Sequence, residues 1–170
     1  GVKTNFEIDV FAPLTAVIAS EAKQSKNEIA SSAENRQQPP RNDARSKVNA
    51  IADHVRAVTF CIADGVMPSN EERGYVVRKL IRRAMSHAQD IGIKEPFLYK
   101  LVSVVAEVMK AQYPEVKERR DDIAQVVKRE EENFLSVIAV QLPKVEAAFE
   151  ELSKEKDDPR PALGAWLTDP

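Results

Sequence analysis

The chain has 170 residues, of which 43% are hydrophobic and 31% are charged, enough for one ordinary hydrophobic core. Its 25 basic and 27 acidic residues nearly cancel, to a net charge of −2, which excludes a chain that binds nucleic acid through overall positive charge. The single cysteine excludes an internal disulfide and a cysteine-based zinc cluster, and no apolar run approaches the roughly 18 residues of a membrane span. A soluble, cytoplasmic protein fits these properties.

The first 45 residues are predicted to contain little regular structure. Because the chain begins with Gly1 rather than Met, we expect that the true start of the protein is missing. Residues 15–22 could form a short helix. Residues 23–42 are polar and lack aromatic side chains, so they cannot bury enough apolar surface to offset the entropy of ordering. We therefore expect residues 21–45 to be a flexible polar insertion; a partner-binding tail is the alternative.

Helical periodicity dominates the rest of the chain. A first long helix is expected over residues 46–63, with Ser46 as its cap and Gly65 as its stop signal. A second helix is expected over residues 70–91. A third is expected over residues 96–114, because proline is favoured as a first helical residue.

A long last helix is expected over residues 117–152. Its apolar stripe consists of Ile123, Val127, Phe134, Ile138, Leu142, Val145 and Phe149. Pro143 removes a backbone donor within this helix and is expected to kink or split it. Together these patterns predict a mainly α fold: a helical bundle with a long C-terminal helix and a disordered N-terminal insertion.

The helix over residues 70–91 has two contrasting faces. Ser69 and Glu72 have the S-x-x-E spacing of a capping box, which predicts that this helix starts at about Asn70. At about 100° per residue, one side is basic and consists of Arg78, Lys79, Arg82 and Arg83. The other side is apolar and consists of Val77, Leu80, Ile81, Ala84 and Ala88. The apolar side would pack on a core, while the basic side suits a polyanion, of which nucleic acid is the commonest large example.

The run from Ile51 to Arg83 resembles the alanyl-tRNA synthetases. The matching segments are IADHVRAVTF, IADGVMPSNEERGY and VVRKLIRRA, in one order and at close spacing. NFEIDVFAPL near the start and the later segments EPFLYKL and EEENFL continue the resemblance, which covers most of the chain except about residues 20–45. The resemblance implies the helical tRNA-recognition domain that follows the class II catalytic domain.

The resemblance assigns roles to two candidate base-reading residues. Asn70 aligns with an asparagine that reads the G·U wobble pair of the acceptor stem, the identity signal of the alanine tRNA. From its chemistry alone, the amide of Asn70 could either bond to a base edge or cap the helix. Asp169 is the nearest match to a second reader, an aspartate within a leucine–tyrosine–aspartate–threonine–tyrosine–glycine segment, although Thr168 and Pro170 depart from that pattern.

Five basic residues of the same helix are candidate contacts to tRNA phosphates: Arg73, Arg78, Lys79, Arg82 and Arg83. The alternative is a solvated surface with internal ion pairs. The acids that could form such pairs are few in the neighbouring sequence, mainly Glu72 and Asp90, which favours contact with tRNA.

The resemblance also implies a division of the chain. Residues 1–20 would be the tail of the catalytic domain, residues 46–153 the tRNA-recognition domain and residues 154–170 a truncated C-terminal extension. ATP and magnesium would bind in the catalytic domain, before Gly1, so this chain is expected to hold no catalytic residue, metal or cofactor. Its expected partners are the acceptor stem of the alanine tRNA and the catalytic and editing domains of the parent enzyme. A helical protein-interaction scaffold is the rival function.

Overall fold

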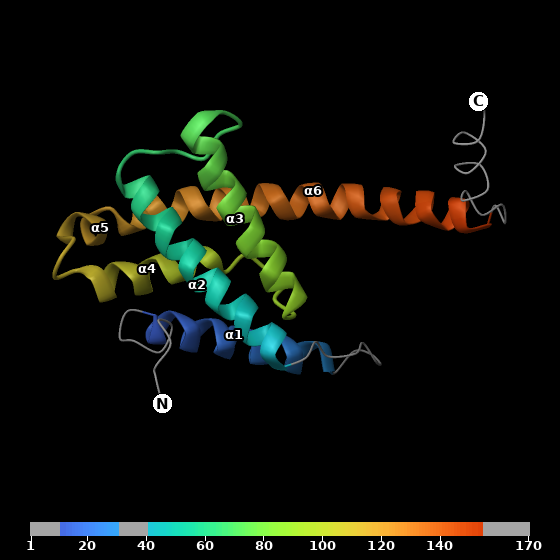
Figure 1. The fold of residues 1–170 in the computed structure, drawn as a ribbon, viewed down its shortest axis with the longest axis horizontal. Coiled ribbons are helices and arrows are strands. Elements are labelled where there is room, and N and C mark those ends of the chain that lie inside the picture. The colour runs from blue at the N-terminus through green and yellow to red at the C-terminus, as the bar shows by residue number, and fades with distance from the viewer. Residues whose placement is uncertain (1–10, 31–40, 155–170) are drawn as a thin grey trace, which may run out of the picture. The chain divides into compact units, whose positions relative to one another are not determined.

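A computed structural model describes residues 11–30 and 41–154 of the chain (Figure 1). Within these ranges the chain forms six helices and no strand: α1 (Ala12–Ala30), α2 (Arg41–Ala63), α3 (Glu72–Asp90), α4 (Leu98–Met109), α5 (Pro114–Glu118) and α6 (Arg120–Lys154). The mainly α fold that the sequence predicts is therefore confirmed. None of the described helices is long and apolar enough to cross a membrane. The described residues form two compact units, one that ends at Phe134 and one that begins at Leu135.

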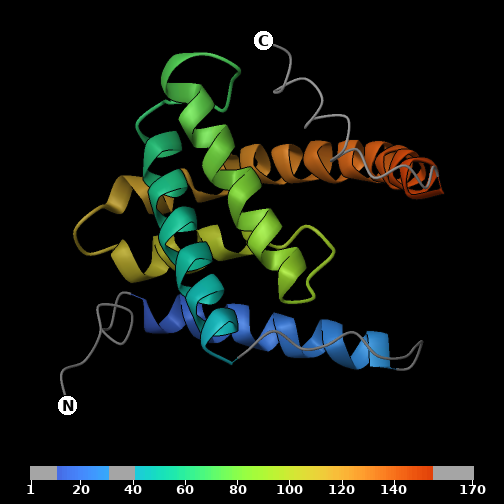
Figure 2. The ribbon, with the colours of Figure 1, turned by 45° about the vertical axis from the view of Figure 1, so that its right-hand side comes forward.

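The core of the first unit is built around α2. This helix packs against α1, α3, α4 and α5, and both ribbon views show it beside α3 and across α1 (Figures 1 and 2). Apolar side chains from several helices are fully buried there: Ile18 from α1, Ile51, Val58 and Ile62 from α2, Val77 and Ile81 from α3, Leu101 and Val105 from α4, and Ile123 from α6. Removing this apolar surface from water is the main force that holds these helices together.

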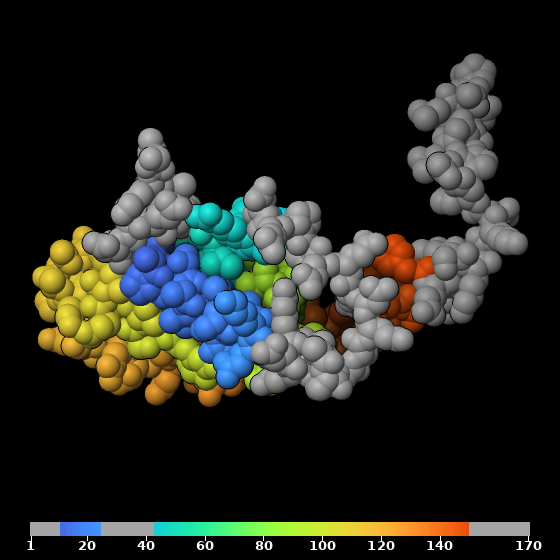
Figure 3. All heavy atoms as spheres, turned by 90° about the horizontal axis from the view of Figure 1, so that it is seen from below, coloured from blue at the N-terminus to red at the C-terminus, as the bar shows by residue number. Residues whose placement is uncertain are grey.

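α1 lies at the surface of the first unit, where Figure 3 shows it in blue beside α2 in cyan. Leu14 and Ile18 turn towards the core and are buried. On α4, the Nζ atom of Lys100 lies 3.1 Å from Oε1 of Glu21. α1 is thus attached by one apolar side and by an ion pair.

Both helices that border the predicted insertion are longer than the sequence patterns indicate. α1 runs on to Ala30, and α2 begins at Arg41 rather than at Ser46. A surface helix needs only one apolar side, so a polar stretch can still be helical. The alanine, lysine, glutamine and glutamate residues of this stretch are also good helix formers. Residues 21–30 and 41–45 of the predicted insertion are therefore helical. Residues 31–40 lie outside the described residues.

The second unit contains the C-terminal part of α6. Pro143 lies inside this helix, which continues from Arg120 to Lys154 without the split that its sequence predicts. One proline removes one backbone donor, and the helix continues on both sides of the missing bond. The distal part of the predicted apolar stripe is exposed, as Leu142, Val145 and Phe149 all are. Among the described residues, nothing covers these three side chains with a core.

A buried carboxylate of α6 closes the N-terminal end of α4. Glu131 is fully buried, and its Oε1 accepts hydrogen bonds from the backbone N–H groups of Phe97 at 2.9 Å and Leu98 at 2.8 Å. Its Oε2 accepts a third from the backbone N–H of Tyr99 at 3.0 Å. N–H groups at the start of a helix have no acceptor within the helix, so Glu131 supplies what α4 lacks. α4 starts at Leu98, after the Pro96 at which its start was predicted.

Two opposing effects act on the acidity of Glu131. Burial raises the pKa of its carboxyl to about 7, because the charged form loses its hydration, while the three backbone N–H donors favour the charged form. The ordinary pKa, 4.5, applies to the unfolded chain. The folded protein therefore binds an extra proton between these two values, and its free energy of unfolding should fall as the pH rises through that window.

We expect this effect to amount to about 3 kcal/mol, at roughly 1.4 kcal/mol per pKa unit. Urea titrations of the wild type and of Glu131→Gln, which cannot titrate, should show their difference in unfolding free energy falling by this amount from pH 5 to pH 8. Glu132→Gln, at an exposed neighbouring position, is the control for loss of a carboxylate on the same helix; because the charge of Glu132 makes only the smallest contribution to the raised pKa of Glu131, its difference should vary far less with pH. A difference that grows with pH would mean that the three N–H bonds outweigh the cost of burial.

Candidate nucleic-acid interface

α3 presents one side to the core and the other to solvent. Its buried residues are Gly74, Val77, Ile81, Ala84, Met85 and Ala88. On the other side lies the basic face, which consists of the exposed Lys79, Arg82 and Arg83 and the half-buried Arg78. Arg73 is exposed in the first turn. The two contrasting sides that the sequence predicts are confirmed, except that Leu80 is only partly buried and Met85 is a further buried residue.

The loop before α3 folds back against the first turn of the helix. The backbone N–H of Ser69 donates a hydrogen bond to the carbonyl of Gly74 at 3.1 Å. A Cβ atom added to Gly74 would lie 2.9 Å from Cβ of Ser69 and would overlap the Met67 carbonyl oxygen, so a side chain at this position would push the loop away. Glycine is required here because the two backbone segments approach so closely.

The predicted capping box is wrong. The N-cap residue of α3 is Glu71, whose side chain makes no capping hydrogen bond. Oγ of Ser69 instead accepts a hydrogen bond from the Glu71 backbone N–H at 3.3 Å and donates one to the Glu71 carbonyl at 2.8 Å. Glu72 has a φ of 47°, in the left-handed region, which turns the backbone away from the geometry of a capping box. Asn70 therefore lies before the helix rather than in its first turn, and it is exposed.

Asn70 belongs to a network of charged and polar side chains. Its Oδ1 accepts a hydrogen bond from Nη1 of Arg78. Nε of Arg78 lies 2.9 Å from Oε1 of Glu130, although its N–H is not directed at an acceptor. The same oxygen lies 3.3 Å from both Nε and Nη2 of Arg82. The network joins the loop before α3, the basic face and α6.

The remaining cations are available to a ligand. Arg73 and Arg83 are exposed and form no ion pair within the described part of the chain. Nζ of Lys79 lies 5.9 Å from the ring centroid of Tyr75, which is itself half exposed. A phosphate could bind to these three side chains without breaking an ion pair between described residues. Their positive charge is not neutralised by a neighbouring acid and so can attract an anion.

Glu130 is the residue that the sequence interpretation missed. Of the two acids predicted to pair with the basic residues, Asp90 instead lies 3.1 Å from Lys47. Glu130 and Glu131 fall between Val127 and Phe134 at positions that would continue the apolar stripe of α6, and both are buried. Carboxylates at positions where apolar residues are expected were the sequence signal that could have indicated buried ion pairs or hydrogen bonds. Asp169 lies outside the described residues.

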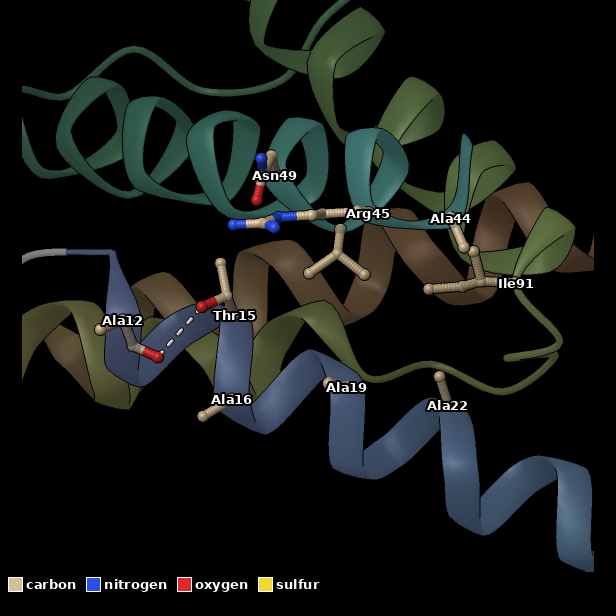
Figure 4. A pocket seen from close by; sticks show the side chains of 10 residues that line it. Ala12, Thr15, Ala16, Ala19, Ala22, Ala44, Arg45, Asn49 and Ile91 are labelled. Atoms are coloured by element: carbon tan, nitrogen blue, oxygen red, sulfur yellow. Dashed lines mark hydrogen bonds between the residues drawn. The ribbon is translucent and has the colours of Figure 1, made fainter. Parts of the chain in front are cut away.

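A separate groove of about 630 Å³ runs between α1 and α2 (Figure 4). Its lining includes alanine side chains of α1, Arg45 and Asn49 of α2, and Ile91 after α3. Thr15 donates a hydrogen bond from Oγ1 to the Ala12 carbonyl at 3.1 Å at its rim. None of the candidate RNA-contacting residues that the structure describes lines this groove.

The amino-acid sequence matches a known protein family and several known proteins. The family described as tRNA synthetases class II (A) matches residues 1–160. The chain is 44% identical over 165 residues to an alanine–tRNA ligase of Geobacillus kaustophilus, covering 97% of this chain and 17% of that protein. It is 42% identical over 158 residues to an alanine–tRNA ligase of Streptococcus pyogenes serotype M28, covering 93% of this chain and 17% of the relative. The chain thus spans less than a fifth of the length of these relatives.

Proposed function

Because the chain belongs to the class II tRNA synthetase family, we propose that it is the part of an alanine–tRNA ligase that recognises the acceptor stem of the alanine tRNA. The complete enzyme would attach alanine to this tRNA, using ATP and magnesium in its catalytic domain. The present chain would hold the acceptor end in place and would need no cofactor of its own. Its partners would be the acceptor stem and the catalytic and editing domains of the same enzyme.

The observation that carries this proposal is a set of exposed cations on α3 that form no ion pair with any described residue, namely Arg73, Lys79 and Arg83. At 1.5 Å per residue, these residues extend over roughly 15 Å of the helix, a length comparable to several phosphates of an RNA backbone. Each phosphate contact releases a counterion, which makes the affinity strong at low salt and independent of sequence. Arg78 and Arg82 would contribute less charge, because both share Glu130.

Selectivity would come from the loop in front of this surface. Asn70 is exposed there, and the resemblance to the alanyl-tRNA synthetases supports its role as a reader of the G·U wobble pair. In the same proposal Asp169 is the second reader. An amide and a carboxylate suit this task because base edges are distinguished by their hydrogen-bond donors and acceptors, which phosphate-binding cations cannot sense.

We expect the double variant Lys79→Gln, Arg83→Gln to bind an alanine acceptor-stem hairpin about tenfold more weakly than the wild type at 0.1 M salt. The slope of log affinity against log salt should flatten by about one unit per lost contact. The loss should be equal for hairpins of different sequence, because phosphates carry no sequence information. Fluorescence anisotropy over a series of salt concentrations measures both quantities.

A matched control removes two charges elsewhere on the first unit. Lys94→Gln with Lys110→Gln changes the net charge equally at exposed positions outside α3, and should alter the affinity and the salt slope far less. Unchanged binding and slope in the α3 variant would contradict the proposal. That result would favour a helical protein-interaction scaffold.

A further inference from the structure

One carboxylate of α6 contacts two residues of the basic face of α3, Arg78 and Arg82. Glu130 is only 5% exposed, and its Oε1 lies 2.9 Å from Nε of Arg78. The same guanidinium donates a hydrogen bond through Nη1 to Oδ1 of Asn70. A continuous line of polar contacts therefore leads from a buried acid to an exposed amide.

The contact with Arg78 decides which end of the Asn70 amide is free. A guanidinium carries N–H donors and no acceptor, so the atom that faces it must be the carbonyl oxygen of Asn70. The Nδ2 group is left as a donor without a partner among the described residues. Since both side chains are already held in place, binding a base acceptor would cost less conformational entropy than it would for a freely rotating amide.

We propose that Glu130 is a positioning residue: it holds Arg78, and through Arg78 it fixes the Asn70 amide as a donor towards the base pair that is read. This inference rests on the function proposed above. Glu130 then favours selectivity at the expense of affinity, because its negative charge also cancels part of the positive charge that attracts phosphates. The two properties should change in opposite directions when the charge is removed.

Glu130→Gln tests this inference, since it removes the charge and keeps the size of the side chain. Dissociation constants of the 170-residue chain are measured for two acceptor-stem hairpins that differ only in a G·U or a G·C pair at the position that is read. We expect the variant to lose about tenfold of its preference for the G·U hairpin. Its affinity for the G·C hairpin should stay equal or rise about twofold to threefold. A parallel loss of affinity for both hairpins would overturn the proposal.

Two further variants separate positioning from a general effect of charge. Glu132→Gln removes the same charge from an exposed neighbour on α6 and should leave the preference unchanged. In the Asn70→Ala background, Glu130→Gln should have no further effect on the preference, because both changes disable the same contact. Additive losses from Glu130→Gln and Asn70→Ala would contradict the proposed connection.

The NMR signals of the Asn70 side-chain amide give a readout that does not depend on RNA. We expect Glu130→Gln to shift these signals towards the values of an asparagine side chain that is mobile in water. The signals of core residues should stay in place. If the wild type binds neither hairpin, the proposed function fails, and the NMR result alone decides whether Glu130 positions Asn70. Unchanged Asn70 signals, or a full G·U preference in Glu130→Gln, would overturn the positioning role.

Discussion

Replacing Asn70 by alanine is expected to reduce the preference for a G·U over a G·C acceptor stem by about tenfold to a hundredfold, since a good base contact contributes roughly 1–3 kcal/mol of discrimination. The affinity for duplex RNA in general should change little, because the phosphate-binding cations remain. Aminoacylation by the complete enzyme, compared for the two tRNA acceptor stems, measures the effect. The stability of the fold should change by no more than about 0.5 kcal/mol, because Asn70 is exposed and does not cap α3.

Asn70→Asp is the matched variant for this experiment. A carboxylate retains an acceptor for Arg78 but removes the Nδ2 donor. We therefore expect it to lose the G·U preference as fully as the alanine variant does. If aspartate keeps the preference of the wild type, the donor is not what reads the base pair, and Asn70 serves only to hold Arg78.

Replacing Glu131 by alanine is expected to lower the free energy of unfolding by on the order of 3–5 kcal/mol at pH 7. The substitution leaves three backbone N–H groups at the start of α4 without their acceptor, and each unsatisfied buried donor costs roughly 1–3 kcal/mol unless water reaches it. It also removes a side chain that is fully buried between α4 and α6. For a chain of this size each kcal/mol lowers the midpoint by roughly 2–4 °C, so thermal melts should show a drop of about 10 °C.

The neighbouring position distinguishes this effect from a general weakness of α6. Glu132→Ala changes an exposed glutamate whose nearest cation, Lys128, is 3.9 Å away. Exposed ion pairs of this kind contribute little, so its midpoint should remain within a few degrees of the wild type. A small effect of Glu131→Ala would show that other groups satisfy the first turn of α4.

The helices and the sides of α3 could be predicted from the sequence because both depend on local periodicity. Val77, Ile81 and Ala88 recur at helical spacing and are buried, and the basic residues between them are not. Nothing in that pattern depends on distant parts of the chain. Patterns of this kind therefore recovered the surface on which the proposed function rests.

The detailed geometry of the candidate site could not be predicted in the same way, because it depends on residues far apart in the sequence. Glu130 pairs with Arg78 and Arg82 only after the N-terminal part of α6 has packed beside α3 within the first unit. The start of α3 differs from the predicted one because the Ser69 hydroxyl bonds to the backbone of Glu71, an interaction that competes with capping. Short sequence motifs do not show which of two such local bonds is formed.

The adjacency of Glu130 and Glu131 constrains how this protein can vary in length. Consecutive residues of a helix point about 100° apart. Because of this angle, Glu130 contacts α3 while Glu131 contacts the start of α4. Inserting or deleting a single residue between Val127 and Glu130 would rotate both side chains past their partners and would detach two helices at once. Changes in chain length are therefore better tolerated in the connections between helices than in this turn of α6. The number of residues in this turn determines whether α3 and α4 both keep their contacts with α6.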